Sequence, residues 1–349
     1  MGRVDAPRVG VLPAGARDSI ADVADVTVGH ATIADGALQT GVTVVRPHAG
    51  DLYRAPVPAA AVVINGFGKT TGLVQLNELG TLESPIALTN TFAVGTVATA
   101  MIRHAIAQNA EIGRAMRTLN PVVAECNDGF LNDLQAFAVE ERHFLQAFDA
   151  VSVDFAQGAV GAGRGMSCFE LKGGIGSSSR MAGEHPIGAL VLANFGRLSQ
   201  MTLCGVPLGR DLAQATALPG PVAVPEVRAS SRGDGSIIVV LATDAPLDHR
   251  QMRRLATRAA AGIARTGANF SHGSGDIALA FSTRTRAETG ATVADAALDP
   301  FFDAAAEAVE QAIVNALFAA ETVRGFQDHV RYAITERLSG WRSRFAGNR

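Results

Sequence analysis

The chain has 349 residues, of which 48% are apolar and only 18% are charged, and its formal net charge is −3. This length can hold one large domain or two smaller ones with a sizeable core. The small negative charge provides no basic field for a nucleic acid, and no apolar run reaches the roughly 18 residues that a membrane-spanning helix needs. Cys126, Cys168 and Cys204 are widely spaced, which indicates a reducing compartment and neither a disulfide framework nor a metal site.

The N-terminus and the low charge give two further expectations. The first 22 residues contain Arg3, Arg8 and Arg17 and lack the apolar stretch of a secretory signal, so we expect a cytoplasmic protein. Because so little charge is available to cover its surface, the chain is expected to bury part of that surface in an oligomer.

Short apolar runs alternate with Ala-rich helical patterns along the chain. Runs typical of strands buried on both faces are 41–45, 60–64, 187–193, 237–241 and 277–281. Apolar residues at three- and four-residue spacing, with capping residues before them, predict helices at 90–106, 131–148, 244–265 and 300–323. The Gly- and Ser-rich stretch 157–180 is expected to be irregular. The Pro-, Ala- and Gly-rich stretch 217–235 has the composition of an exposed linker.

The linker ends in the hexapeptide SRGDGS at 231–236, directly before the apolar run 237–241. Gly233 and Gly235 permit backbone angles that other residues avoid, so the peptide before Ser236 can be bent and strained. A serine in this place is able to attack its own preceding carbonyl and cut the chain. It then becomes an N-terminal residue with a nucleophilic hydroxyl and a free amine. Taken alone, the segment is more typical of an Asp-Gly hairpin turn that opens an ordinary strand.

A second hydroxyl lies 38 residues after Ser236, in the segment SHGSGD at 271–276. Glycines on both sides leave the Ser274 hydroxyl accessible, and Asp276, two residues on, points to the same side in an extended segment. A carboxylate beside a hydroxyl orients it and stabilises a cation while a proton passes. The alternative is a polar turn in which Asp276 caps its own backbone.

The pair Gly235-Ser236 before an apolar strand, followed at this distance by SHGSGD, resembles the L-aminopeptidase/D-esterase and β-peptidyl aminopeptidase family of self-cleaving serine hydrolases. Other segments match the family in the same order, so the resemblance covers roughly residues 20 to 285. These segments are 22–23, 28–30, GFGK at 66–69, PIALTNT at 85–91, PVVAECNDG at 121–129, KGGIGSSSR at 172–180 and LANFG at 192–196.

The resemblance implies roles for the residues that match. Ser236 would be the nucleophile both for self-cleavage and for acyl transfer from the substrate. The cut at Gly235-Ser236 would leave an α part of 1–235 and a β part of 236–349. Ser274 and Asp276 would hold and relay the proton near the new Ser236 amine. Many relatives carry Glu where Asp276 stands, and Asp is one methylene shorter.

Three more positions receive roles from the same resemblance. Asn194 would donate a hydrogen bond to the oxyanion, an interaction typically worth about 10²–10³ in rate, although by itself an Asn at a strand end is typical of a turn. Glu125 would bind the free ammonium of the substrate. Some relatives have Tyr two residues after this Glu to assist the oxyanion, and here Asn127 occupies that place, so an amide supplies this assistance or it is absent.

The chemistry of an N-terminal serine needs no side-chain base. An α-amine titrates near pH 7.7–8.0 in peptides, so at neutral pH a useful fraction acts as a base and a catalytic histidine is unnecessary. No HExxH motif or carboxylate cluster with metal spacing is found, and the Gly-rich segments 161–166 and 173–176 match no nucleotide-binding loop. We therefore predict neither a metal nor an organic cofactor.

The resemblance also implies a fold, an assembly and an activity. The fold is a single α/β domain over 1–349, a four-layer αββα sandwich that resembles the N-terminal nucleophile hydrolases with different connectivity, and the assembly is a homo-tetramer of αβ units. The activity is that of an autoprocessed serine aminopeptidase or amidase that releases small N-terminal L-, D- or β-amino acids from peptides, amides or esters.

Two alternatives stay open on the sequence. One is hydrolysis of synthetic or cyclic amides, or acyl transfer to an amine, at the same N-terminal Ser236. The other is a non-enzymatic Gly-rich ligand-binding protein in which Gly235-Ser236 is only a turn. The second alternative predicts an uncut chain.

Overall fold

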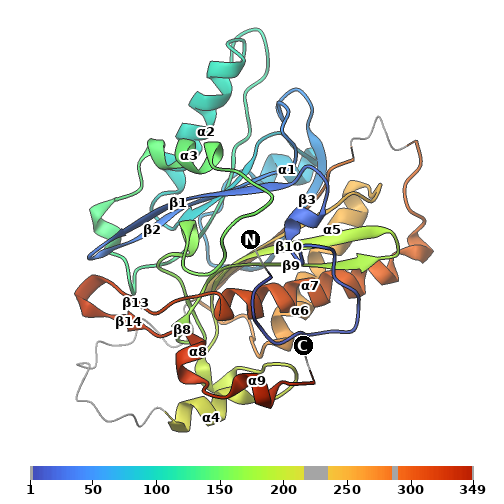
Figure 1. Cartoon of the computed structure of the whole chain (residues 1–349). Coiled ribbons are helices and arrows are strands. Elements are labelled where there is room, and N and C mark those ends of the chain that lie inside the picture. The colour runs from blue at the N-terminus through green and yellow to red at the C-terminus, as the bar shows by residue number, and fades with distance from the viewer. Residues whose placement is uncertain (1–2, 216–234, 285–289, 348–349) are drawn as a thin grey trace.

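Two stacked β-sheets form the centre of the computed structural model, which describes residues 3–215, 235–284 and 290–347 (Figure 1). The strands of the first sheet, in spatial order, are β1 (Thr27–Asp35), β2 (Leu38–Arg46), β5 (Ile86–Asn90) and β6 (Val122–Cys126). Those of the second are β4 (Thr81–Leu82), β3 (Val57–Gly66), β12 (Gly275–Ser282), β11 (Ser236–Thr243), β10 (His185–Asn194) and β9 (Gly174–Ala182). Neighbours are antiparallel except for the pairs β5–β6 and β11–β12, which are parallel.

Helices cover the outer face of each sheet, so the predicted four-layer αββα arrangement is confirmed (Figure 1). On the first sheet lie α2 (Val94–Gln108) and α3 (Glu141–Asp149), and on the second lie α5 (His249–Thr257), α6 (Ala259–Arg265) and α7 (Asp299–Phe318). Among the helices of the described residues, none combines the length and apolar character needed to cross a membrane.

Several shorter elements connect or flank these layers. They are α1 (Leu73–Leu79), α4 (Leu208–Ala215), α8 (Ile334–Arg337), α9 (Trp341–Arg344), the strand pair β7 (Ser167–Cys168) and β8 (Leu171–Lys172), and the strand pair β13 (Val323–Arg324) and β14 (Val330–Arg331). Short 3-10 helices lie at Ile20–Asp22, Leu134–Ala136, Gly161–Gly163, Leu198–Gln200, Asp295–Ala297 and Phe326–Asp328.

The five apolar runs that predict strands lie in β2, β3, β10, β11 and β12, so these predictions are confirmed. Strand β11 shows why such a run is continuous rather than alternating. Ile238 and Val240 belong to the core between the sheets, whereas Ile237 and Val239 belong to the core under the helices. A strand with cores on both faces has no position for a solvent-exposed polar residue.

Two predicted helices begin later than the polar residues chosen as their caps. Asn90 is the last residue of β5, and its Oδ1 accepts a hydrogen bond from the backbone nitrogen of Ala93 at 3.1 Å, so α2 starts only after this turn. Asp244 is not a cap either, because Asp248 Oδ1 accepts from the backbone nitrogen of Gln251 at 2.8 Å and α5 begins there. The helix predicted at 244–265 is observed from His249 to Arg265 as two helices, α5 and α6, which are separated at Arg258.

Of the other two predicted helices, the one at 131–148 is wrong, and the one at 300–323 is confirmed as α7 but ends earlier than expected. The single helix predicted at 131–148 is wrong, because Phe137 adopts a left-handed φ of 47° and only α3 is α-helical. Leu131 packs instead with Ala159 and Val323 in a small separate cluster. The last long helix ends at Phe318, and Val323 lies in a strand rather than in this helix. Leu131 and Val323 match the helical spacing in the sequence, but both lie outside the helices, in the small cluster with Ala159.

The Gly- and Ser-rich stretch 157–180 is not irregular throughout, because its last residues belong to β9. A Cβ at Gly176 would lie 1.9 Å from the carbonyl oxygen of Ala312 in α7. The small residues therefore allow α7 to pack closely against the strand, and the composition reflects this close approach. The predicted linker 217–235 lies outside the described residues except for Gly235.

Candidate active site

Ser236 is the first residue of β11 and is 5% exposed. In the sheet it lies opposite Asn194 of β10 on one side and opposite Gly275 of β12 on the other. Side chains alternate between the two faces of a strand, and Ile238, two residues on, lies in the core between the sheets. The Ser236 hydroxyl therefore points toward the space between the two sheets.

One backbone group contacts both the hydroxyl and the carbonyl that precedes it. The Gly275 N–H donates to Ser236 Oγ at 3.2 Å and to the carbonyl oxygen of Gly235 at 3.1 Å. A Cβ at Gly275 would lie 2.5 Å from the carbonyl oxygen of Phe67 and 3.1 Å from Ser236 Oγ, so only glycine fits. Sequence analysis missed this group, because a backbone N–H has no signature in the sequence.

Gly235 lies against the end of β10, where no room is left for a side chain. A Cβ at Gly235 would lie 2.7 Å from the carbonyl oxygen of Asn194 and 2.8 Å from Phe195 Cα. Lack of space next to β10 is therefore what requires a glycine.

The structure brings Ser274 and Asp276 together. Ser274 Oγ donates to Asp276 Oδ1 at 2.6 Å, which confirms that the two side chains lie on the same side of the segment. Asp276 is two residues before Ala278, which belongs to the core under the helices. The pair thus reaches the Ser236 end of β11 from the helical side of the sheet, whereas the Ser236 hydroxyl faces the other side.

Asp276 is an unusual carboxylate because it is 1% exposed. Burial raises its pKa to about 6, against hydrogen bonds from Ser274 Oγ and the Ile237 backbone that lower it. Asp276 Oδ2 is buried and has no hydrogen-bond partner within the described part of the chain. Together with Ser274 and Phe195, Asp276 lines a small cavity of about 10 Å³.

Asn194, the last residue of β10, is held at both ends of its amide. Its Oδ1 accepts from the backbone nitrogen of Ser167 at 2.8 Å, and its Nδ2 donates to the carbonyl oxygen of Asn127 at 2.9 Å. Directly opposite residues of an antiparallel pair have side chains on the same face, so this amide lies on the face of the Ser236 hydroxyl. An amide nitrogen carries two hydrogens, and the described residues accept only one.

Glu125 is 3% exposed and lies near the end of β6. Its Oε1 accepts from the backbone nitrogen of Lys69 at 2.9 Å. A Cβ at Gly68 would lie 3.4 Å from Glu125 Oε1 and 3.9 Å from Gly275 Cα. The turn after β3 therefore lies between the Glu125 carboxylate and the backbone that contacts Ser236.

Asn127 contributes to this region through its backbone. Its carbonyl oxygen accepts from Asn194, while its own side-chain Oδ1 accepts from the backbone nitrogen of Gly129 at 2.9 Å. The side chain is exposed and stabilises the local turn.

Cys126 contacts the backbone of Ser236, whereas the sequence indicates for this residue only a reducing compartment. Its Sγ donates to the carbonyl oxygens of Ser236 at 3.4 Å and Leu192 at 3.6 Å, and burial raises the pKa of the thiol well above its usual value. The protonated thiol is therefore a packing group beneath β11. In the described ranges, no group of three His, Cys, Asp or Glu residues forms a candidate metal site.

A larger cavity, about 140 Å³, lies elsewhere and contains none of these residues. It is lined by side chains of β2, α2 and α3, among them Arg46, His104 and Phe148. Its volume alone does not make it the site, because no candidate nucleophile or oxyanion donor reaches it.

Comparison with known proteins supplies the family context of this geometry. The model of peptidase family S58 matches residues 18–331. The chain is 40% identical over 337 residues to the beta-peptidyl aminopeptidase BapA of Sphingosinicella microcystinivorans, covering 89% of this chain and 84% of that protein. The PH0078 protein of Pyrococcus horikoshii OT3 has a TM-score of 0.85 and 44% identity, with 94% of each chain covered.

A second solved structure connects the fold to its class. The L-aminopeptidase D-Ala-esterase/amidase of Ochrobactrum anthropi has a TM-score of 0.84 and 35% identity, with 99% of this chain and 98% of that chain covered. It is described as a prototype for the serine aminopeptidases and as a new variant of the Ntn hydrolase fold. This confirms the expected likeness to N-terminal nucleophile hydrolases. These findings do not favour the acyltransferase or the non-enzymatic alternative.

Proposed function

Because the chain belongs to peptidase family S58 and is a serine aminopeptidase, we propose that Ser236 is its nucleophile and that the chain cuts itself between Gly235 and Ser236. The observation that carries this proposal is the Gly275 nitrogen, which lies 3.2 Å from Ser236 Oγ and 3.1 Å from the Gly235 carbonyl oxygen. This shared contact keeps the hydroxyl beside the carbonyl that it has to attack. The products are 1–235 and 236–349.

Self-cleavage then follows from these contacts. Ser236 Oγ attacks the carbonyl carbon of Gly235, and the Gly275 N–H stabilises the negative charge that develops on the carbonyl oxygen. The C–N bond breaks as the Gly235–Oγ ester forms, and the proton from Oγ moves to the nitrogen of Ser236. One water hydrolyses the ester, which leaves a carboxylate on Gly235 and a free hydroxyl and amine on Ser236.

The same hydroxyl then serves the substrate. The Ser236 amine takes the Oγ proton while Oγ attacks the substrate carbonyl, and the spare Nδ2 hydrogen of Asn194 stabilises the oxyanion. The substrate C–N bond breaks as its nitrogen receives that proton, and water hydrolyses the resulting ester. Ser274 and Asp276 stabilise the ammonium of Ser236 while it carries the proton, because the Asp276 carboxylate supplies the opposite charge.

Glu125 selects substrates with a free N-terminal amine. Its carboxylate is buried beside the turn that follows β3, and a buried carboxylate favours a cationic partner. The burial of Ser236, Asn194 and Glu125 supports small N-terminal residues. The names of the relatives, a beta-peptidyl aminopeptidase and an L-aminopeptidase D-Ala-esterase/amidase, support L-, D- or β-residues in peptides, amides or esters.

The assembly and compartment belong to the same proposal. The low charge content supports a homo-oligomer, which we expect to be a tetramer of αβ units. Three free cysteines support a reducing compartment such as the cytoplasm. Light scattering coupled to size-exclusion chromatography measures the mass of the assembly, and a monomeric mass contradicts the expected tetramer.

Mass spectrometry and denaturing electrophoresis of the purified protein test the self-cleavage. Two fragments are expected, with the second beginning at Ser236, and Ser236→Ala is expected to remain one intact and inactive chain. Ser271→Ala is the matched control. The hydroxyl of this half-buried turn residue donates to Asn269 Oδ1 among the described residues, and the variant should be cut and active. An uncut wild-type chain with full activity contradicts the mechanism.

A substrate panel tests the requirement for a free amine. Glycine, D-alanine and β-alanine p-nitroanilides are compared with their N-acetylated forms. Release of p-nitroaniline is expected only from the unblocked compounds. Equal rates on blocked and unblocked substrates contradict the role of Glu125 without affecting that of Ser236.

A further inference from the structure

Lys172, the last residue of β8, is a fully buried cation, and within the described residues no carboxylate forms a hydrogen bond with it. Its Nζ donates to the carbonyl oxygens of Gly163 at 2.9 Å, Met166 at 2.9 Å and Gly173 at 2.7 Å. Burial lowers the pKa of this group well below its usual value. Three acceptors nevertheless favour the ammonium, because an amine has only two hydrogens to donate.

One of these three carbonyls belongs to a peptide group that also forms a hydrogen bond with Asn194, the proposed oxyanion donor. The carbonyl of Met166 and the nitrogen of Ser167 belong to the same peptide group. Lys172 donates to the oxygen of that peptide at 2.9 Å, and the N–H of the same peptide donates to Asn194 Oδ1 at 2.8 Å. A charge on the carbonyl polarises the peptide and strengthens hydrogen bonding by its N–H.

The orientation of the Asn194 amide depends on this peptide. The two ends of an amide have nearly the same shape, but only the nitrogen can donate. An N–H at Ser167 can only donate and a carbonyl at Asn127 can only accept, so together they fix which end is Oδ1 and which is Nδ2. A peptide rotated away from this position would leave the amide free to turn its oxygen toward the oxyanion, which is repulsive.

We propose that Lys172 is a positioning residue for the Asn194 amide and acts through the peptide between Met166 and Ser167. This inference rests on the proposed role of Asn194 as oxyanion donor. It differs from a purely structural role, in which Lys172 would hold the loop 163–173 without any specific effect on the chemical step.

A double-mutant cycle separates these roles. Lys172→Met keeps a long side chain but donates no hydrogen bond. The kcat of this variant on glycine p-nitroanilide is measured alone and in combination with Asn194→Ala. In each case kcat is calculated per mole of self-cleaved protein. Lys172→Met alone is expected to lower kcat about tenfold or more, as for the loss of a charge-assisted hydrogen bond, with KM changed by less than about threefold. In the Asn194→Ala background it should lower kcat no further.

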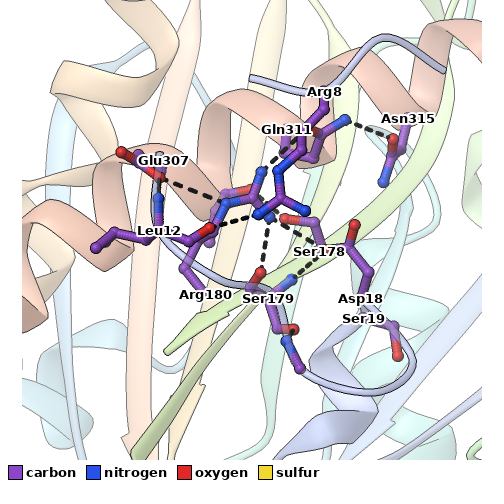
Figure 2. Close-up of polar contacts among 12 residues, drawn as sticks. Arg8, Leu12, Asp18, Ser19, Ser178, Ser179, Arg180, Glu307, Gln311 and Asn315 are labelled. Carbon is purple, nitrogen blue, oxygen red and sulfur yellow. Dashed lines mark hydrogen bonds and ion pairs between the residues drawn. The ribbon is translucent and has the colours of Figure 1, made fainter. Parts of the chain in front are cut away.

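Arg180→Met is the matched control for loss of a buried cation. Arg180 is also fully buried, but its contacts lie with Asp18, Glu307 and Gln311, and none of these residues belongs to the proposed site (Figure 2). This variant should lower the melting temperature and leave kcat of the cleaved protein within about twofold. If Lys172→Met fails to fold, Lys172→Gln, a shorter donor, replaces it in the same cycle.

Each outcome has one meaning. If Asn194→Ala leaves kcat unchanged, the proposed role of Asn194 fails and the inference fails with it. If Asn194→Ala lowers kcat but Lys172→Met has no effect, or has its full effect in both backgrounds, only the inference about Lys172 is overturned. Failure of both Lys172 variants to fold also overturns it, because the residue then acts on the fold as a whole.

Discussion

Arg180 in β9 and Lys172 in β8 both have 0% of their surface exposed, but different groups surround them. The Arg180 guanidinium lies among acidic and amide side chains: Nη1 donates to Asp18 Oδ1 at 3.1 Å, Nη2 donates to Gln311 Oε1 at 3.0 Å, and Nε lies 3.5 Å from Glu307 Oε2. Among the described residues, the hydrogen bonds of Lys172 Nζ all go to backbone carbonyls.

The contacts of Arg180 join three distant parts of the chain. Figure 2 shows the guanidinium between α7 and the N-terminal segment that crosses β9. Glu307 also accepts hydrogen bonds from the backbone nitrogens of Val11 and Leu12, and Gln311 accepts one from Val9. The charge is neutralised within the cluster, so its effect is on how firmly the N-terminal segment is attached.

The surroundings of Arg180 and of Lys172 determine which groups each buried charge affects. Arg180 is paired with opposite charges, which leaves little of its field to act elsewhere. Lys172 instead donates to peptide carbonyls, and one of these peptides, between Met166 and Ser167, donates through its N–H to Asn194 Oδ1. In the part of the chain that the structure describes, one hydrogen on Asn194 Nδ2 and the Oδ2 atom of Asp276 have no hydrogen-bond partner. Substitutions near Ser236 should therefore change rates, and those near Arg180 should change stability.

The largest expected effect is that of Asp276→Asn. An amide of the same shape keeps the packing but removes the negative charge that we propose stabilises the Ser236 ammonium. The expected fall in kcat is about 10²–10⁴-fold, the range for loss of a group that assists proton transfer. Kinetics on the cleaved protein measure it, and a kcat within threefold of wild type would show that Asp276 is only a structural partner of Ser274.

The pH dependence of the wild type follows from the same residue. Since burial raises the pKa of Asp276 to about 6, the carboxylate form is lost as pH falls through about 6. Protonation of the Ser236 amine should already lower kcat by up to about tenfold per pH unit below its ordinary pKa of about 7.7–8.0. Loss of the Asp276 carboxylate should then steepen this fall toward about a hundredfold per pH unit below about 6. Stability changes in the opposite direction. The neutral form contributes stability that is fully present below the unfolded pKa of about 3.9 and is lost as pH rises through about 6. At pH 5, circular dichroism should show that the protein is folded, and kinetic measurements should show that its activity is low.

Asn194→Ala is expected to lower kcat by about 10²–10³-fold, because it removes the proposed donor to the oxyanion. Asn194→Asp should be at least as slow, since a carboxylate has no hydrogen to donate and repels the oxyanion. Both variants should retain nearly the same KM. An Asp variant with wild-type kcat would contradict the donor role.

Glu125→Gln is expected to act on KM rather than on kcat. Gln keeps an oxygen that can accept from the Lys69 nitrogen, so the turn after β3 should be preserved. Loss of a charge-assisted hydrogen bond to the substrate ammonium raises KM roughly tenfold to a hundredfold. Steady-state kinetics with glycine p-nitroanilide decide this, and an unchanged KM would place the ammonium elsewhere.

Arg180→Met should have the smallest effect on activity and a large effect on stability. It leaves Asp18 and Glu307 without their cation, and breaking one side of a buried ion pair costs about 3–5 kcal/mol of unfolding free energy. Denaturant unfolding measures the loss, with kcat expected within about twofold of wild type. A fall in kcat as large as that of Lys172→Met would remove the distinction between the two clusters.

Local patterns in the sequence predict those parts of the fold that depend on neighbouring residues. The apolar runs locate five strands, and the two-residue spacing places Ser274 and Asp276 on one side, as their 2.6 Å hydrogen bond confirms. The helix ends are less well predicted. Capping depends on which polar side chain reaches the first turn, and Asp248 does so where Asp244 does not.

The sequence by itself therefore determines the strands, the Gly235-Ser236 pair and its family, because these depend on residues that are adjacent or closely spaced. Only the tertiary structure decides that Asn194 faces Ser236, that one N–H of Gly275 contacts both the hydroxyl and the carbonyl before it, and that Lys172 reaches Asn194 through a peptide. The physical reason is that strand register and backbone hydrogen bonds join residues far apart in the chain, and the backbone groups that make them are the same in every residue except proline.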